Sequence, residues 1–437
     1  MTSVFLPLPL AGEGRGEGKP LSGAARAAEG RGDGPRALLA LALIATAAAC
    51  SRDINLLGPR ADGGGGADTV SPNDTVTVNP ACSGLGDPIA LPTAAGSTCA
   101  AALATRGHRF ALCSCETMNA PARVRTDAYD SRDPLAFDET AAAIGIGGNL
   151  TSTAEVRAGG AFYVAGAGGI DASNHIRSSL SLRVGGPVTI HNDNGDIGTD
   201  AYINGNVTGN VRVDGTLHVA AGAVLGPGVE AASVVNEAVS VPSPCDCSAG
   251  FVNVGAAVSA AATNNANAAI GLSPSALAAV STTTMIDLPC GTFYVDKIYA
   301  DAAVTVAVHG RTVLAVAGDV ALHAAFSVVL DPSAELDLIV GGRLTTSGGG
   351  AFGAAGAAAR FRAWIAGTST ISFDDAPAVH AVIHAPFAPV TAASGLPLSG
   401  SLLARSVSIG ADSDLHYDRA ILEAGTICNE PAASVVP

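Results

Sequence analysis

The sequence has few of the side chains that fill an ordinary globular core. Aromatic residues make up 4% of the 437 residues, and there is a single Trp. Alanine, valine and glycine dominate instead, and such small residues suit the narrow interior of stacked coils. With 48% hydrophobic residues the chain is still able to bury a large core.

Basic residues are scarce as well. The chain has 23 Lys and Arg against 38 Asp and Glu, for a net charge of −15. Phosphate binding draws on clustered Lys and Arg, and no basic stripe is present, so we expect no nucleic acid partner. The acidic balance serves to keep an Ala-rich surface soluble.

Familiar catalytic motifs are missing. The sequence contains no Gly-x-Ser-x-Gly, no His-Glu-x-x-His, no Walker loop and no dinucleotide-binding glycine set between a strand and a helix. We therefore predict a protein that is not an enzyme and that carries no cofactor.

The stretch HNDNGD, residues 191–196, is a weak calcium candidate. Together with Asp200, its Asp193 and Asp196 offer oxygen ligands. The distal Glu of an EF-hand loop is missing, however, and Asn-Asp-Asn-Gly is ordinary turn chemistry, so a turn is favoured over a metal site.

Two histidine-bearing stretches remain. In HAVIH, the flanking prolines favour a strand, on which His380 and His384 would lie about 13 Å apart and serve a structural role. In LHYDRAIL, residues 415–422, the polar group His416 to Arg419 predicts a local network that caps the solenoid, with a binding site as the alternative.

The fold is indicated by INGNVTGNVRVDGTLHV, residues 203–219. Its odd positions are apolar or Gly and its even positions are polar, which is typical of strands with one buried face. One strand of that length would span roughly 55 Å, so breaks are expected at Gly205, Gly209 and Gly215. Short strands turning around one interior predict a β-solenoid coil, with a meander of hairpins as the alternative.

The same template recurs along the chain. LRVGGPV, VRVDGTL, LAVAGDV and LIVGGRL all share it, with YINGNV as a shortened copy. Gly186 and Gly205 are 19 residues apart and Gly318 and Gly342 are 24 apart, which suits one coil per interval. We predict an all-β fold, a β-solenoid (β-helix) with a short helical, Cys-bearing insertion and a small Cys-stapled N-terminal module.

The N-terminal region predicts export. Arg36 precedes about a dozen apolar residues that end in three alanines before Cys50, a run too short to span a membrane. This layout resembles the lipobox of bacterial lipoproteins, which implies cleavage before Cys50 and its lipidation. Ser51 resembles the outer-membrane sorting signal, so the resemblance implies a Gram-negative outer-membrane lipoprotein, on the periplasmic face or at the cell surface.

Residues 1–35 do not fit an ordinary signal. The stretch LPLPLAGEGRGEG is rich in Gly, contains Glu and lies far before Arg36. It resembles an intergenic repeat that has been translated by mistake. We expect translation to begin near the stretch before Arg36, with an unusually long signal n-region as the alternative.

The other eight cysteines are an even number, which is consistent with disulfides in an oxidising compartment. The cysteines fall into an N-terminal set and a C-terminal set of four each. The two cysteines of a Cys-x-Cys stretch are poorly placed to join each other, which leaves two possible pairings within each set. In the C-terminal set, Cys245 or Cys247 is expected to join Cys290 or Cys428. Zinc is the rival, but the spacing is not that of a zinc ribbon. The two sets are Cys82, Cys99, Cys113 and Cys115, and Cys245, Cys247, Cys290 and Cys428.

Composition and repeats divide the chain into seven segments. An Ala-rich stretch with helical spacing predicts one or two helices in the insertion, the second starting at Ser273. The expected segments are 1–49, signal and mistaken start; 50–80, lipidated Cys and flexible tether; 81–140, Cys-stapled module; 141–232, solenoid coils; 233–300, helical insertion; 301–425, solenoid coils; and 426–437, tail.

Two family resemblances are carried by these repeats. HAPFAPV (384–390), GSLLARSVSIGADSDLHYD (400–418) and AELDLIVGGRL (334–344) resemble a Gly-rich β-repeat domain of unknown function of bacterial surface and pilus-assembly-like proteins, over about 300–425. The stretch 203–219 is more weakly similar to bactofilins, polymer-forming β-helix proteins. Neither family brings catalytic residues, and the second implies self-association.

Three functions follow from these observations. The first is a non-catalytic envelope lipoprotein whose rigid solenoid is a structural scaffold or an adhesive surface component. The second is a binding module for a polysaccharide or an envelope protein. The third is a polysaccharide lyase or hydrolase, for which only Asp193, Asp196 and Asp200 offer carboxylates.

Overall fold

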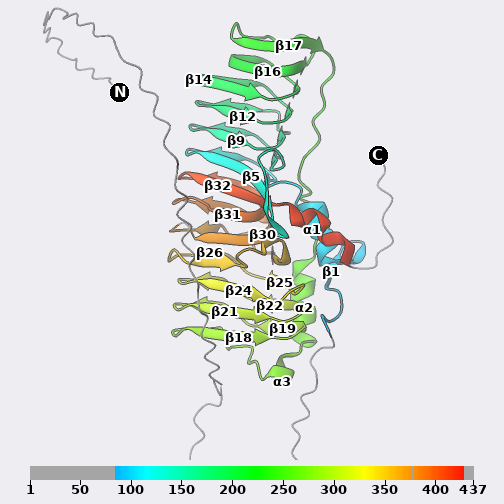
Figure 1. Cartoon of the computed structure of the whole chain (residues 1–437), viewed down its shortest axis with the longest axis vertical. Coiled ribbons are helices and arrows are strands. Elements are labelled where there is room, and N and C mark those ends of the chain that lie inside the picture. Colours follow the sequence, from blue (N-terminus) through cyan, green and yellow to red (C-terminus); the bar gives the residue numbers. More distant parts are fainter. Residues whose placement is uncertain (1–83, 376, 428–437) are drawn as a thin grey trace, which may run out of the picture. The chain divides into compact units, whose positions relative to one another are not determined.

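The computed structural model describes residues 84–427 except residue 376, which all fall in one compact unit of the chain. They form a β-solenoid of about 14 turns with few helices, so the predicted fold class is confirmed (Figure 1). The expected signal, Cys50 and the tether up to residue 80 lie outside the described residues.

Each coil has three sides, and equivalent strands of successive coils pair in parallel. Leu182 pairs with Ala201 and Val320 with Leu344, so the spacings of 19 and 24 residues in the sequence are coil lengths. Residues that alternate along the strands point inward and form one continuous apolar core.

The first stack of coils comprises residues 112–236. On its first side lie β3 (Leu112–Ser114), β7 (Ile144–Ile146), β10 (Phe162–Val164), β13 (Leu182–Val184) and β15 (Ala201–Ile203); on the second, β4 (Met118–Ala120), β8 (Leu150–Ser152) and β11 (Ile170–Ala172); on the third, β5 (Val124–Asp130), β9 (Val156–Ala158) and β12 (Ile176–Ser178). The strands β14 (Val188–Ile197), β16 (Val207–Val219) and β17 (Val229–Asn236) turn corners.

The second stack comprises residues 284–418. On its third side lie β18 (Thr284–Leu288), β21 (Val304–Val308), β24 (Phe326–Leu330), β27 (Ala351–Gly353) and β32 (Ser413–Asp418); on the first, β19 (Gly291–Val295), β22 (Arg311–Val316), β25 (Glu335–Val340) and β28 (Phe361–Ile365); on the second, β20 (Ile298–Ala300), β23 (Val320–Leu322), β26 (Leu344–Thr346) and β29 (Ile371–Phe373); β30 (Ala378–Ala392) and β31 (Leu398–Ile409) turn corners.

The stretch 203–219 behaves as its alternation predicts. Val207, Val211, Val213 and Leu217 are buried in the core, while the polar residues between them face outward. Gly209 has a positive φ of 94°, and a Cβ there would lie 2.0 Å from the carbonyl oxygen of Ile190 in the coil below. Only glycine allows this corner to stack so closely on its neighbour.

Two antiparallel strand pairs and several short helices lie outside the coils of the solenoid. The second helix of the insertion begins at Asn267 rather than at Ser273 and ends at Ile270, followed by Gly271 in a left-handed conformation. These elements are β1 (Ala90–Thr93) with β2 (Gly96–Cys99), β6 (Asp133–Asp138) against β5, α1 (Ala100–Gly107), α2 (Val254–Thr263), α3 (Asn267–Ile270), η1 (Ala358–Arg360) and η2 (Arg419–Ile427).

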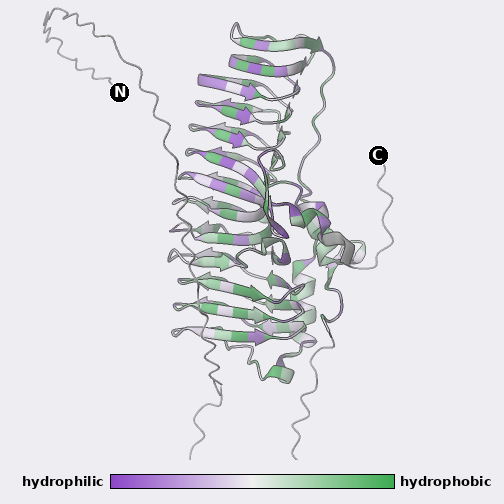
Figure 2. Cartoon of the chain, in the orientation of Figure 1, coloured by the Kyte–Doolittle hydropathy of each residue, from purple (hydrophilic) through white to green (hydrophobic). Residues whose placement is uncertain are grey.

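Helix α2 covers the first side of the second stack. Val254 and Val258 of the helix pack with Ala315, Ile339 and Trp364, whose side chains would otherwise face water. In line with this cover, the second-stack strands are more hydrophobic than those of the first stack (Figure 2). None of the described helices is long and apolar enough to span a bilayer.

Candidate functional site

The two stacks meet in the middle of the solenoid rather than following each other along it. The last coil of the chain pairs in parallel with the first, since Leu402 lies opposite Leu112 and Ser413 opposite Val124. We call this junction the seam. After β17 the chain returns along the solenoid and starts the second stack at the far end (Figure 1).

The seam was not predicted. Residues 81–140 were expected to form a module of their own, but β3, β4 and β5 from that range are coil strands with neighbours on both edges. The fold therefore joins strands nearly 300 residues apart in the sequence, and the two ends of the described chain hold each other in place.

Four polar residues form a row across the third side at the seam. His380 of β30 lies opposite Ser399 of β31, Ser399 opposite His416 of β32, and His416 opposite Asp127 of β5. The His416 Nδ1 and Asp127 Oδ1 atoms are 2.6 Å apart. Sequence spacing alone aligns His380, Ser399 and His416 at coil-length intervals, whereas Asp127 is placed by the seam.

This row lines a hollow of about 300 Å³, together with Tyr129, Phe137 and Gly356. The hydrogen bond to Asp127 raises the pKa of His416, whereas partial burial lowers the pKa of His380. Burial, followed by the charge of Asp418, raises the pKa of Tyr129. The Nδ1 atom of His380 is buried and has no hydrogen-bond partner among the described residues.

The combination of Ser, His and Asp invites comparison with a hydrolytic triad, in which the serine hydroxyl contacts the imidazole. Within residues 84–427, apart from 376, no hydrogen bond joins Ser399 to His416 or His380; its hydroxyl interacts with Tyr129 instead. The arrangement offers hydrogen-bonding and aromatic groups to a ligand.

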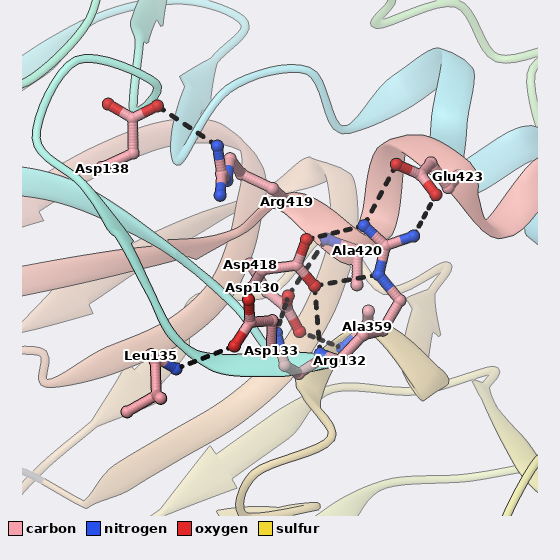
Figure 3. A network of polar contacts seen from close by, with 11 residues as sticks. Asp130, Arg132, Asp133, Leu135, Asp138, Ala359, Asp418, Arg419, Ala420 and Glu423 are labelled. Carbon is pink, nitrogen blue, oxygen red and sulfur yellow. Dashed lines mark hydrogen bonds and ion pairs between the residues drawn. The ribbon is translucent and has the colours of Figure 1, made fainter.

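Beside this hollow, Asp418 joins three segments of the chain (Figure 3). Its buried carboxylate accepts hydrogen bonds from the backbone N–H groups of Ser131, Ala359 and Ala420, at 3.0–3.1 Å. Because these donors belong to the β5–β6 turn, η1 and η2, one carboxylate holds the first coil, the second stack and the end of the described chain together.

Arginines complete the network. Arg132 donates to Asp130 from two guanidinium nitrogens and from its backbone N–H, and it also pairs with Glu423. Arg419 pairs with Asp138 at 3.2 Å (Figure 3). Asp130 has its pKa lowered to about 2, chiefly by its hydrogen bond with Arg132.

The stretch His416 to Arg419 thus forms a polar network, as expected, but it does not cap an end of the solenoid. His416 and Asp418 act at the seam as described above, and the Tyr417 hydroxyl donates to the His108 carbonyl at 2.7 Å. The expectation of a cap is wrong because another coil, that of β5, stacks on β32.

A second hollow, of about 550 Å³, lies on the other side of Gly356 and is lined partly by Arg311, Arg360 and Arg362. Arg362 is fully buried and binds Asp337 at 2.7 and 2.8 Å and Glu335 at 2.5 Å. Trp364 also donates a hydrogen bond to Asp337 at 2.7 Å. The buried charges of Arg362, Asp337 and Glu335 thus find their partners within the protein, as buried charges generally do.

Two disulfides tie the return segment to the first coil. Cys113 is bonded to Cys245 and Cys115 to Cys247. Cys99 and Cys290 are disulfide-bonded as well. For the two resolved bonds, pairing within each cysteine set is wrong, because the chain after β17 runs back past β3. Cys50, Cys82 and Cys428 lie outside the described residues.

The three calcium candidates are not brought together. The Asp193 carboxylate accepts from the Asn194 N–H, Asp196 binds His175 at 2.9 Å, and Asp200 accepts from the Thr216 N–H at 2.7 Å. No group of three His, Cys, Asp or Glu residues in the described part of the chain is able to hold a metal ion.

His380 and His384 lie on strand β30, as predicted. They belong to different sides of the coil: His380 lines the seam hollow, whereas His384 is buried and stacks on Phe251 with ring centroids 5.0 Å apart. Burial lowers the pKa of His384 to about 3 and also lowers the pKa of its neighbour His108.

By its fold the chain is a β-solenoid protein whose first and last coils are neighbours. Residues 235–424 match the model of a family described as a domain of unknown function (DUF7305). The match covers the return segment and the whole second stack, and it overlaps residues 300–425, over which the sequence resembles a β-repeat domain of unknown function. No curated protein and no solved structure matches the chain.

Proposed function

We propose that the protein is a non-catalytic lipoprotein of the Gram-negative outer membrane, in which the solenoid is a rigid structural or adhesive component. The observation that carries this proposal is the uninterrupted solenoid of about 14 turns, locked by the seam and by two disulfides. Such a body resists bending because every coil is hydrogen-bonded to its neighbours.

The place where the described chain begins supports this role. The Leu85 carbonyl accepts a hydrogen bond from the Arg311 N–H at 2.7 Å, and a Cβ on Gly86 would touch Cys290. The described chain therefore joins the solenoid near β19 and β22, toward the end of the column opposite β17.

The anchor is tested by Cys50→Ala. We expect the wild-type protein in the outer-membrane fraction and the variant in the soluble or uncleaved fraction, because lipid is the anchor that the sequence provides. The matched control is Ser51→Ala, which keeps the modified cysteine. If Cys50→Ala still sediments with outer membranes after salt and carbonate washes, the lipoprotein proposal fails.

The second candidate function is a binding module for a polysaccharide or an envelope protein. It is favoured by the seam hollow, where Phe137 and Tyr129 provide aromatic surface and Asp127, Ser399 and His416 provide polar groups. One aromatic wall with a few polar groups is a common design for ligand pockets.

A glycan array probed with the purified chain tests this candidate. Binding that is lost in Phe137→Ala and retained in Leu135→Ala, a change at another exposed residue of the same hairpin, would support the hollow as the site. Equal binding by both variants, or binding to no glycan, would remove polysaccharide as the ligand.

A further inference from the structure

The two ends of the solenoid are finished differently. At the end formed by β18, β19 and β20, which we call the closed end, residues 266–280 lie across the coil. Within that segment Leu277 is fully buried, and Ile270 and Leu272 pack against the core. Backbone hydrogen bonds join Ala266 to Thr292 and Leu277 to Tyr299 at 2.7 and 2.8 Å.

At the other end, which we call the open end, β17 is hydrogen-bonded along one edge only, to β16. Its eight residues, Val229–Asn236, leave the second edge without a strand partner in the described part of the chain. An unpaired strand edge of this length readily accepts another strand, and proteins normally cover or charge such edges.

The core itself is uncovered at the open end. Val229, Ala231 and Val234 lie in register with Val211, Val213 and Leu217, which are buried inside the preceding coil. Val234 nevertheless keeps 47% of its surface exposed. Exposed inward-facing residues indicate an incomplete solenoid end, because terminal repeats ordinarily carry a polar outer face.

This end carries few charges that would keep it apart from a partner. Between residues 219 and 237 the charged side chains are Glu230 and Glu237, and the Glu237 carboxylate is engaged by His218 at 2.7 Å. The nearby apolar side chains of Val224 and Val235 are 62% and 38% exposed. A nearly uncharged, partly apolar surface favours an uncharged partner of similar character.

We propose that the open end binds the open end of a second copy of this chain, to form a closed dimer. A second open end provides an unpaired strand edge and an uncovered apolar interior of the same cross-section. The closed end does not, since residues 266–280 occupy it. An isologous contact between two like ends stops at two copies, whereas a contact between unlike ends would continue into a filament.

The orientation of the solenoid leaves this contact free. The described chain begins near the closed end, where Leu85 binds Arg311, so the open end lies at the opposite end of the column (Figure 1). The inference goes beyond the proposed scaffold role and does not depend on lipidation, because the interface is made by the solenoid alone.

Sedimentation velocity over a concentration series tests the dimer. The full chain is used with Cys50→Ala, so that lipid does not drive association. We expect a dimer for this protein and a dissociation constant raised at least about tenfold, or 1.4 kcal/mol, by Val234→Lys at the open end. The matched control is Met285→Lys at the closed end, where Met285 is 62% exposed.

Two further readouts separate the alternatives. Thermal unfolding of both lysine variants checks that each is folded. Oxidation of Ser233→Cys, a change within β17, should give a cross-linked dimer. A monomer at all concentrations, a filament, or a dimer broken by Met285→Lys but not by Val234→Lys would each overturn the proposal.

Discussion

At the scale of single residues, position relative to the core matters more than chemical type. Arg212 and Val213 are neighbours in β16, yet Val213 is 2% exposed and packs inside the coil, whereas Arg212 faces outward and pairs with Asp214. The same rule explains the histidines, since His384 is buried behind Phe251 while His416 lines a hollow and binds Asp127.

Val213→Asp should lower the free energy of unfolding by several kcal/mol, because it places an unpaired charge in the apolar interior. Arg212→Asp removes an exposed pair and should change it little. Urea unfolding of the two variants measures the difference. Midpoints that agree within error would contradict the inward placement of Val213.

Protonation of buried histidines should make the protein less stable in mild acid. Burial lowers the folded-state pKa of His384 to about 3 and also lowers that of His108. Below the unfolded value near 6.5, the unfolded chain binds protons that the folded chain refuses, so stability falls as pH falls, by about 1.4 kcal/mol per pH unit for each histidine.

His416 acts in the opposite direction. Its raised pKa contributes stability that is present below the unfolded value and is lost as pH rises through the folded value. Between pH 6.5 and pH 4, His384→Phe should therefore flatten the loss of stability, whereas His416→Asn should leave that slope unchanged and instead remove a loss of stability that sets in as pH rises above about 6.5. Unfolding free energies measured from pH 4 to pH 8 would refute the assignment if His384→Phe kept the wild-type slope below pH 6.5 and His416→Asn kept it above.

At the scale of elements, the disulfides bind the return segment to strand β3 and the residue that follows it. Cys113–Cys245 and Cys115–Cys247 each join residues 132 positions apart and close almost the same loop. Their stabilising effects should not add, because most of the loop entropy is removed by the first bond and little is left for the second.

Removing either disulfide alone, by Cys113→Ser with Cys245→Ser or by the equivalent change at Cys115 and Cys247, should cost about 1 kcal/mol. Removing both should cost on the order of 4–5 kcal/mol, in the chain-entropy account. Denaturant unfolding of the three variants under non-reducing conditions measures this. Single losses that sum to the double loss would show that the two bonds act independently.

At the scale of the whole molecule, the seam makes the two stacks one structure. Strand β3 has β31 on one edge and β7 on the other. The first coil to be synthesised therefore gains its second strand partner only when the last coil has been made. Contacts between Leu112 and Leu402 bridge nearly the full described chain, and such long-range pairing is expected to slow folding.

The sequence by itself determined the local structure of the solenoid. A period of two over residues 203–219 predicts strands and their buried face, and the spacing of Gly186 from Gly205 predicts a coil length, because alternation and glycine corners are local properties. It also predicted that β30, with its two histidines, is a strand.

Only the tertiary structure decided how the coils are ordered. The sequence does not reveal that Asp127 meets His416, that Cys113 meets Cys245, or that Asp418 binds Ser131, because each partner lies far away in the chain. Any two coils of this solenoid have similar apolar interiors, so local patterns do not specify which coil stacks on which. Contacts made at the seam and along the return segment, between residues about 130–290 positions apart, select the order.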